Sequence, residues 1–315
     1  MMRAASFLIL SLVLLPFAQP NAYAQTLGTA DPFAVLAGTS VTNGGAGVLG
    51  ATVITGELGV SPKSTCTGFG TCPVTGPGTI SGPLHLGDAV AGFAENDLTT
   101  AYNTLYALGS NPSTVTEVLS GGVLTGQDLG PGVYTTDAAS MLLDGTLKLN
   151  DGGKDGSVFV FVMSSSLTTD PGSTIDVSKL QPGDSLFWVV GSSATIGDDT
   201  VFEGNILANT SITFDAGATD LCGRALAEGG TVSFAGQGPT SGIENEVSIG
   251  CTSTTSTLIP TLAGSYGLNG LLSPGGGGGG TPIPEPGTLP LLGSGFIGLV
   301  GMAWMTRAKA RTRPA

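Results

Sequence analysis

Ser or Thr alternates with an apolar residue in five short segments of the chain, and this alternation is typical of a β-strand with one buried side. Two of the segments, around Val41 and Ile212, are nearly the same although they lie about 170 residues apart. The apolar residue is predicted to point into a core, with its two hydroxyl-bearing neighbours outside. The ten outward residues are Ser40, Thr42, Ser166, Thr168, Ser193, Thr195, Ser211, Thr213, Thr231 and Ser233.

The clearest copies lie between residues 158 and 236 and recur every 18 to 20 residues, with one spacing near 27. Such periods predict a β-solenoid with three-sided coils. The hydroxyl segment is one strand of each coil. A second strand, such as 204–208, is apolar on both sides and therefore covered, and a third, near 200–202 and 219–221, is shorter.

Another copy, in the segment 33–60, stands far from the others in the sequence. If all copies share one stack, this N-terminal coil must pack beside the C-terminal coils after the chain has made a detour. The sequence therefore predicts a discontinuous solenoid.

A helix is predicted from about residue 88 to 108, because apolar residues there follow helical spacing. Asp88 is its expected N-cap and Gly109 its expected stop. The apolar stripe is expected to lie along the covered side of the solenoid. It consists of Val90, Phe93, Ala94, Leu98, Ala101, Leu105 and Leu108.

Residues 1–24 are predicted to be a signal peptide. Arg3 precedes an apolar run from 4 to 17, and the small-x-small site at 22–24 is typical of cleavage. A retained membrane anchor is the alternative, although the run is short for a span.

The C-terminal part begins with a Gly-rich linker, 271–283, and continues with Pro284, Glu285 and Pro286, an apolar run and a basic tail. This order resembles a PEP-CTERM sorting signal over 284–315. The transmembrane segment is expected at about 287–305, with the tail in the cytoplasm. The resemblance implies transient membrane anchoring, processing by an exosortase-type protease, and a final place at the cell surface or outside the cell. A plain C-terminal anchor is the alternative.

Between these ends, residues 25–270 are predicted to form one domain. Residues 25–283 contain 22 carboxylates and five basic residues, a net charge of −17, which argues against a nucleic-acid partner. In an exported chain, four cysteines favour disulfides over metal ligands. Cys66 and Cys72 bracket a small loop and are expected to pair, which leaves Cys222 with Cys251.

Catalysis finds little support in the sequence. His85 is the single histidine, without a partner motif for a triad, and is interpreted as structural. The acidic pair Asp198-Asp199 is interpreted as a turn. The segment 150–156 faintly resembles a calcium loop, but Lys154 and the missing distal Glu favour a turn. The sequence therefore predicts no enzyme, no metal and no cofactor.

From about 33 to 236 the chain resembles the microbial ice-binding-protein-like family. The matching segments are 33–38, 56–62, 87–89, 97–102, 124–129, 131–134, 190–195, 204–208 and 223–227. The resemblance implies a mainly β fold, namely a discontinuous right-handed β-solenoid of triangular cross-section with one long α-helix packed alongside.

The same resemblance implies binding of ice through an ordered water layer on a flat Ser/Thr face, for which the ten outward residues are the candidates. Ser at 40, 166, 193, 211 and 233 makes this array less ideal than one of threonines alone. The alternative function is a non-catalytic structural or adhesive role at the cell surface or in the extracellular matrix, with an exopolysaccharide as partner.

Overall fold

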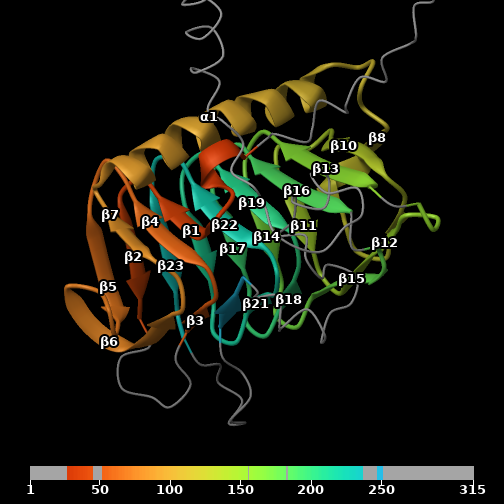
Figure 1. The fold of residues 1–315 in the computed structure, drawn as a ribbon. Helices are drawn as coiled ribbons and strands as arrows, with labels where there is room; N and C mark the ends of the chain where they lie inside the picture. Colours follow the sequence, from red (N-terminus) through yellow and green to blue (C-terminus); the bar gives the residue numbers. More distant parts are fainter. Residues whose placement is uncertain (1–26, 45–51, 155, 182–183, 237–246, 251–315) are drawn as a thin grey trace, which may run out of the picture. The chain divides into compact units, whose positions relative to one another are not determined.

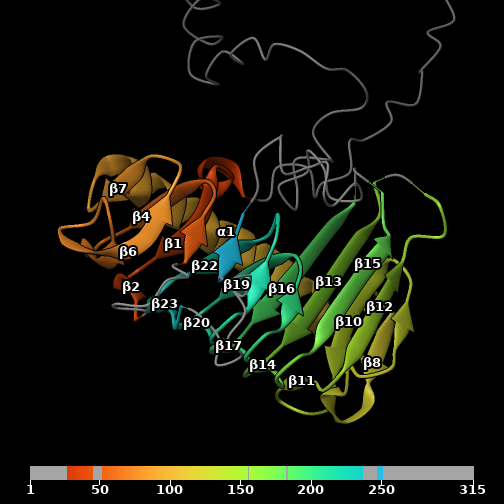
Figure 2. The same cartoon turned by 90° about the horizontal axis from the view of Figure 1, so that it is seen from below.

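The chain turns through three directions and then returns to the first, so that each circuit lays three short parallel strands against the previous circuit (Figures 1 and 2). The computed structural model describes residues 27–44, 52–154, 156–181, 184–236 and 247–250. Every strand pairing within these ranges is parallel. The three directions generate three faces, as the period of the repeats predicted.

One face is covered by the helix α1 (Ala89–Ser110) and is called the covered face (Figure 1). Its nine strands are, in spatial order, β7 (Leu84–Leu86), β4 (Glu57–Val60), β1 (Phe33–Ala37), β22 (Arg224–Ala227), β19 (Asn205–Ala208), β16 (Ser185–Val190), β13 (Val158–Met163), β10 (Gly132–Thr136) and β8 (Glu117–Leu119). The longest of these strands are buried along their whole length, because the helix covers one side and the solenoid interior the other.

The second face contains the Ser/Thr segments and is called the hydroxyl face. Its strands are β11 (Met141–Leu143), β14 (Leu167–Thr169), β17 (Ala194–Ile196), β20 (Ile212–Phe214), β23 (Thr231–Phe234), β2 (Ser40–Asn43) and β5 (Thr65–Phe69). Figure 2 shows six of them, from β11 to β2, side by side in one row.

The third face is made of β9 (Asp128–Leu129), β12 (Thr146–Asn150), β15 (Thr174–Lys179), β18 (Val201–Phe202), β21 (Thr219–Asp220), β24 (Ser248–Ile249), β3 (Val53–Ile54) and β6 (Val74–Ile80). At one end β6 pairs with β5 as well as with β3, which joins the third face to the hydroxyl face. Two short 3-10 helices, η2 (Gly28–Ala30) and η3 (Ser120–Gly122), complete the described elements.

The solenoid is discontinuous, as predicted. Strand β1 lies between β22, almost 190 residues later in the sequence, and β4. The same insertion places β2 between β23 and β5. The first coil of the chain is therefore packed against its last described coil.

Helix α1 begins as predicted, because the Asp88 carboxylate accepts a hydrogen bond from the Ala91 N–H at 2.9 Å. The predicted stop at Gly109 is wrong, because the helix continues to Ser110. Gly109 instead allows close packing: a Cβ there would lie 2.5 Å from the Cβ of Val162 on β13.

The predicted stripe is also wrong at two positions. Val90 and Phe93 are exposed, Phe93 at 63 %. The buried side of the helix is centred instead on Ala91, Ala94 and Leu98, and small alanines let the helix approach the sheet.

The solenoid interior is a separate apolar core from the one beneath the helix. In it, Tyr134, Phe161 and Trp188 from successive coils stack with ring centroids 5.1 and 4.2 Å apart. The Trp188 indole N–H donates to the Glu203 carbonyl oxygen at 2.9 Å. Each coil therefore buries its large side chain on that of its neighbour.

Cys66 and Cys72 form the predicted disulfide, with Cα atoms 5.3 Å apart. The predicted pairing of Cys222 concerns Cys251, which lies outside the described residues. The signal peptide 1–24, the linker and the sorting signal lie outside them as well. In the part of the chain that the structure describes, no helix is both long and apolar enough to cross a membrane.

Candidate functional site

The hydroxyl face carries the candidate residues in two parallel rows, one residue per strand in each row. The first row contains Ser166, Ser193, Ser211, Thr231 and Ser40, and the second contains Thr168, Thr195, Thr213, Ser233 and Thr42. All ten side chains are half-buried, and the residues between them are buried. The predicted parity of these strands is therefore confirmed.

The second row is in direct register from coil to coil. Thr168 lies opposite Thr195, Thr195 opposite Thr213, and Thr213 opposite Ser233. Across the discontinuity, Ser233 lies opposite Thr42 of the N-terminal coil. Two segments that the sequence keeps far apart thus share one surface.

The structure extends both rows with residues that the sequence analysis missed. At one end Thr65 lies opposite Ser40 and Thr67 opposite Thr42. Their Thr-x-Thr pattern was visible, but its central residue, Cys66, had been considered only as a disulfide partner. At the other end Leu142 lies opposite Thr168. A leucine at that position hid the last strand of the face.

Hydrogen bonds between coils hold several of the hydroxyl groups. The Ser40 and Thr231 hydroxyl oxygens are 2.9 Å apart, and those of Thr213 and Ser233 are 3.1 Å apart. In the first row the Ser211 hydroxyl oxygen also accepts from the Thr231 N–H at 3.1 Å. These contacts restrict the side-chain rotamers before any ligand arrives.

Beneath the rows, the face rests on an apolar floor. The inward residues include Val41, Leu167, Ala194, Ile212 and Val232, each at most 1 % exposed. The register is unbroken from β11 to β5, and the first irregularity occurs where β5 meets β6. The result is a regular surface of hydroxyl and methyl groups.

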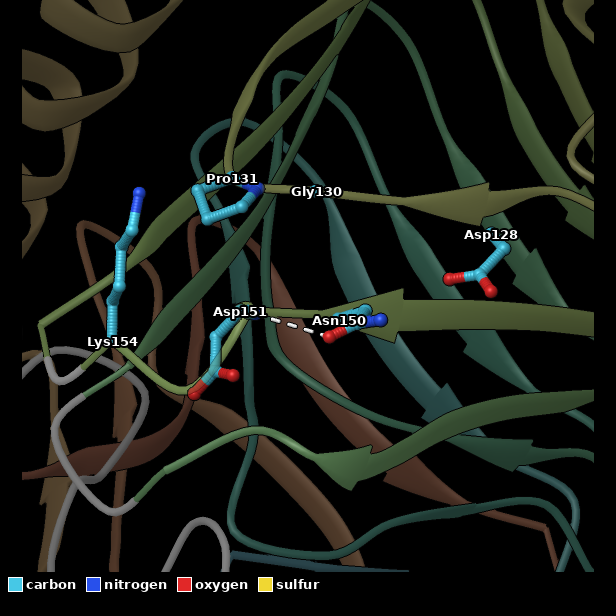
Figure 3. A pocket seen from close by; sticks show the side chains of 7 residues that line it. Asp128, Gly130, Pro131, Asn150, Asp151 and Lys154 are labelled. Atoms are coloured by element: carbon cyan, nitrogen blue, oxygen red, sulfur yellow. Dashed lines mark hydrogen bonds between the residues drawn. The ribbon is translucent and has the colours of Figure 1, made fainter.

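The segment 150–156, which faintly resembled a calcium loop, lines an open depression of about 470 Å³ (Figure 3). Its acidic groups serve the turn: the Asn150 side-chain oxygen accepts from the Gly152 N–H at 3.0 Å, and the Asp151 carboxylate accepts from the Gly153 N–H. Asp128 comes from the neighbouring strand β9. Within the described residues, no group of three or more His, Cys, Asp or Glu side chains is arranged to hold a metal ion.

The other polar candidates also have local roles. The His85 ring bonds the N-cap Asp88 at 2.7 Å and lies 3.5 Å from Glu57. Asp198 accepts from the Ala216 N–H at 3.0 Å, which ties two successive corners between the hydroxyl and third faces. At the same corner, burial raises the pKa of Asp215, and the nearby Asp198 adds to that shift. These interactions are structural.

Comparison with known proteins gives a consistent result. A model of the Ice-binding-like family matches residues 35–238. An ice-binding protein from Nostoc sp. is 41 % identical over 230 residues, which cover 72 % of this chain and 79 % of that protein.

Solved structures agree with the fold. The crystal structure of an ice-binding protein from the Antarctic ascomycete Antarctomyces psychrotrophicus has a TM-score of 0.58 and 36 % identity, covering 67 % of this chain and 95 % of that one. A second crystal structure, of an ice-binding protein from an Antarctic biological consortium, has a TM-score of 0.56 and 36 % identity, covering 74 % and 94 %. The match to the family model extends over more than half of the chain and over all three faces. The chain belongs to the Ice-binding-like family.

Proposed function

We propose that the protein binds ice through the hydroxyl face. The observation that supports this proposal is the double row of Ser and Thr side chains, which stays in register over six strands, from β14 to β5. The relatives described above are ice-binding proteins by name, and the family match supports the same function here.

The physical basis is a surface whose polar and apolar groups are fixed before ice arrives. Adjacent strands are about 4.8 Å apart, so the hydroxyl groups repeat at that spacing along the axis. Threonine has a stiff χ1, and the hydrogen bonds between coils restrict the serines that lack this stiffness. A water layer can then be held by the hydroxyls and confined by the methyl groups, at a small cost in protein entropy.

The direct test is a bulky substitution in the second row with a matched control in the same coil. We expect Thr213→Tyr to abolish most of the thermal hysteresis and ice-recrystallisation inhibition, because the ring would lift the ice from the neighbouring rows. Thr219→Tyr, on the outward side of the third face, is expected to keep both activities. Equal loss in the two variants, with unchanged thermal stability, would remove the hydroxyl face from the proposal.

We also propose that the domain acts outside the cytoplasm. The predicted signal peptide and the resemblance of 284–315 to a PEP-CTERM signal support export, transient membrane anchoring and processing by an exosortase-type protease. Fractionation of cells expressing the full chain, with and without Pro284-Glu285-Pro286, tests this proposal. An intact, uncleaved chain retained in the membrane would favour a plain anchor instead.

A structural or adhesive role at the cell surface is the competing function, and the PEP-CTERM resemblance is the feature that favours it. An exopolysaccharide partner would be expected to stack on exposed aromatic rings, and neither row of the hydroxyl face contains one. If the protein neither shapes growing ice crystals nor inhibits recrystallisation, but binds exopolysaccharide, this role replaces ice binding.

A further inference from the structure

Two glutamates meet where the helix, the N-terminal coil and the C-terminal coil come together. Glu95 lies on α1, and Glu228 directly follows β22. The turn after Glu228 packs tightly on Gly38 of the N-terminal coil, where a Cβ would collide with the Glu228 carbonyl oxygen. The Thr39 hydroxyl donates to the Gly229 carbonyl oxygen at 3.0 Å. The glutamates thus occupy the joint of the discontinuous solenoid.

Each of the two carboxyl groups has one oxygen, Oε1, that is shielded from solvent and has no hydrogen-bond partner among the described residues. A shielded carboxylate oxygen without a partner is costly, and two negative carboxylates facing each other are costlier still. Both costs disappear if a proton lies between the two groups. The geometry therefore favours a shared proton over two charges.

The surrounding groups offer no positive charge instead. The described ion pairs involve His85 and Arg224, and none includes Glu95 or Glu228. From the helix, Tyr102 faces the pair, and Thr99 donates a hydrogen bond that stabilises the Glu228 carboxylate. Asp97 on the same helix accepts hydrogen bonds from the Thr29 N–H and hydroxyl. The two residues of the N-terminal coil at this joint, Gly38 and Thr39, are uncharged.

We propose that Glu95 and Glu228 form a proton-dependent latch, in which one shared proton holds α1 against the joint between the first and last coils. The latch is closed when the proton is present. Its loss leaves two facing carboxylates beneath the helix and loosens the joint.

The electrostatics agree with this geometry. Burial raises the pKa of Glu95 to about 9, with a further contribution from Glu228, and burial also raises the pKa of Glu228. A folded-state pKa above the unfolded value means that folding takes up a proton. The latch's contribution to stability is therefore complete below the unfolded pKa of about 4.3 and is lost as the pH rises through about 9.

Unfolding of the full chain, measured between pH 5 and 9.5, tests the latch. For each proton taken up on folding, the unfolding equilibrium constant is expected to rise about tenfold per pH unit. Glu95→Gln keeps a polar side chain that does not titrate, and we expect it to remove about one proton from this pH dependence. Other buried carboxyl groups, such as Asp184 and Asp220, contribute equally to wild type and variant and cancel in the difference.

Two further variants make the test specific. Because the pair shares one proton, Glu228→Gln is expected to have the same effect, and the double variant is expected to remove no more than either single one. Glu117→Gln, an exposed glutamate on β8, is the matched control and is expected to leave the pH dependence unchanged. Hydrogen exchange of α1 at pH 9 is expected to be slower in Glu95→Gln than in the wild type.

Three results would overturn the proposal. One is a pH dependence of Glu95→Gln that equals that of the wild type. A second is a loss of stability in Glu95→Gln that is the same at every pH, which would show a packing role alone. The third is additive effects of the two single variants, which would show that the glutamates titrate independently.

Discussion

The hydroxyl face and the third face both present Ser and Thr from successive coils, yet they differ in regularity. On the third face a single row is in register, and two of its members are valines. This row is Thr146, Thr174, Val201, Thr219, Ser248, Val53 and Thr79. The hydroxyl face has two rows, and hydroxyl groups occupy both of them from β14 to β5.

The interiors of the two faces differ as well. Every inward residue of the hydroxyl-face row is apolar, whereas the third face places Asp220 inward, opposite Phe202. The third face also has an irregular register between Lys148 and Asn150. Exposed hydroxyls are therefore common to both faces, and the distinguishing feature is an unbroken double row on a uniformly apolar floor.

The strongest way to break this comparison is to give the hydroxyl face the acidic interior residue of the third face. Ile212→Asp would bury a carboxyl group among apolar side chains without a partner, and we expect a loss of about 4–5 kcal/mol in the free energy of unfolding. Chemical denaturation measures this loss. The control Ile212→Val is expected to cost about 1 kcal/mol. If Ile212→Asp were as stable as the control, the apolar floor would not distinguish the two faces.

A smaller effect is expected where the two faces join, at β5 and β6. Replacing both Cys66 and Cys72 by Ala removes a cross-link over a short loop, for which about 2 kcal/mol is expected from loop entropy. Hydrogen exchange should show the change between residues 65 and 80, with the central coils unchanged. Uniform loss of protection along the solenoid would mean that this end coil is not a separate unit of stability.

The smallest effect is expected at the other end of the hydroxyl face. Leu142 is 42 % exposed and continues the second row, so Leu142→Thr would extend that row by one coil. We expect thermal hysteresis to increase by less than twofold, with stability changed by no more than about 0.5 kcal/mol. Val201→Thr fills a gap in the row of the third face and is expected to leave hysteresis unchanged. An equal gain in both variants would mean that the two faces act alike.

The local pattern of the chain was sufficient to predict the strand parity and the helix. Alternation of polar and apolar residues decides which side chains point outward, because successive side chains of a strand lie on opposite sides. The predicted inward position of Val41 and Ile212 follows from their immediate neighbours alone. The repeat spacing in turn predicts three-sided coils, since each coil must bury the same inward side chains.

The tertiary structure decided what lies next to what. Leu142 and the Thr65–Thr67 segment belong to the hydroxyl face because of their register with neighbouring coils, which no local pattern reveals. Gly109 continues the helix because Val162 lies against it, and Phe93 is exposed because alanines face the sheet. Such contacts join residues far apart in sequence. The chain therefore determined by itself which side chains could form a regular surface, and packing of the first coil against the last determined the length and order of that surface.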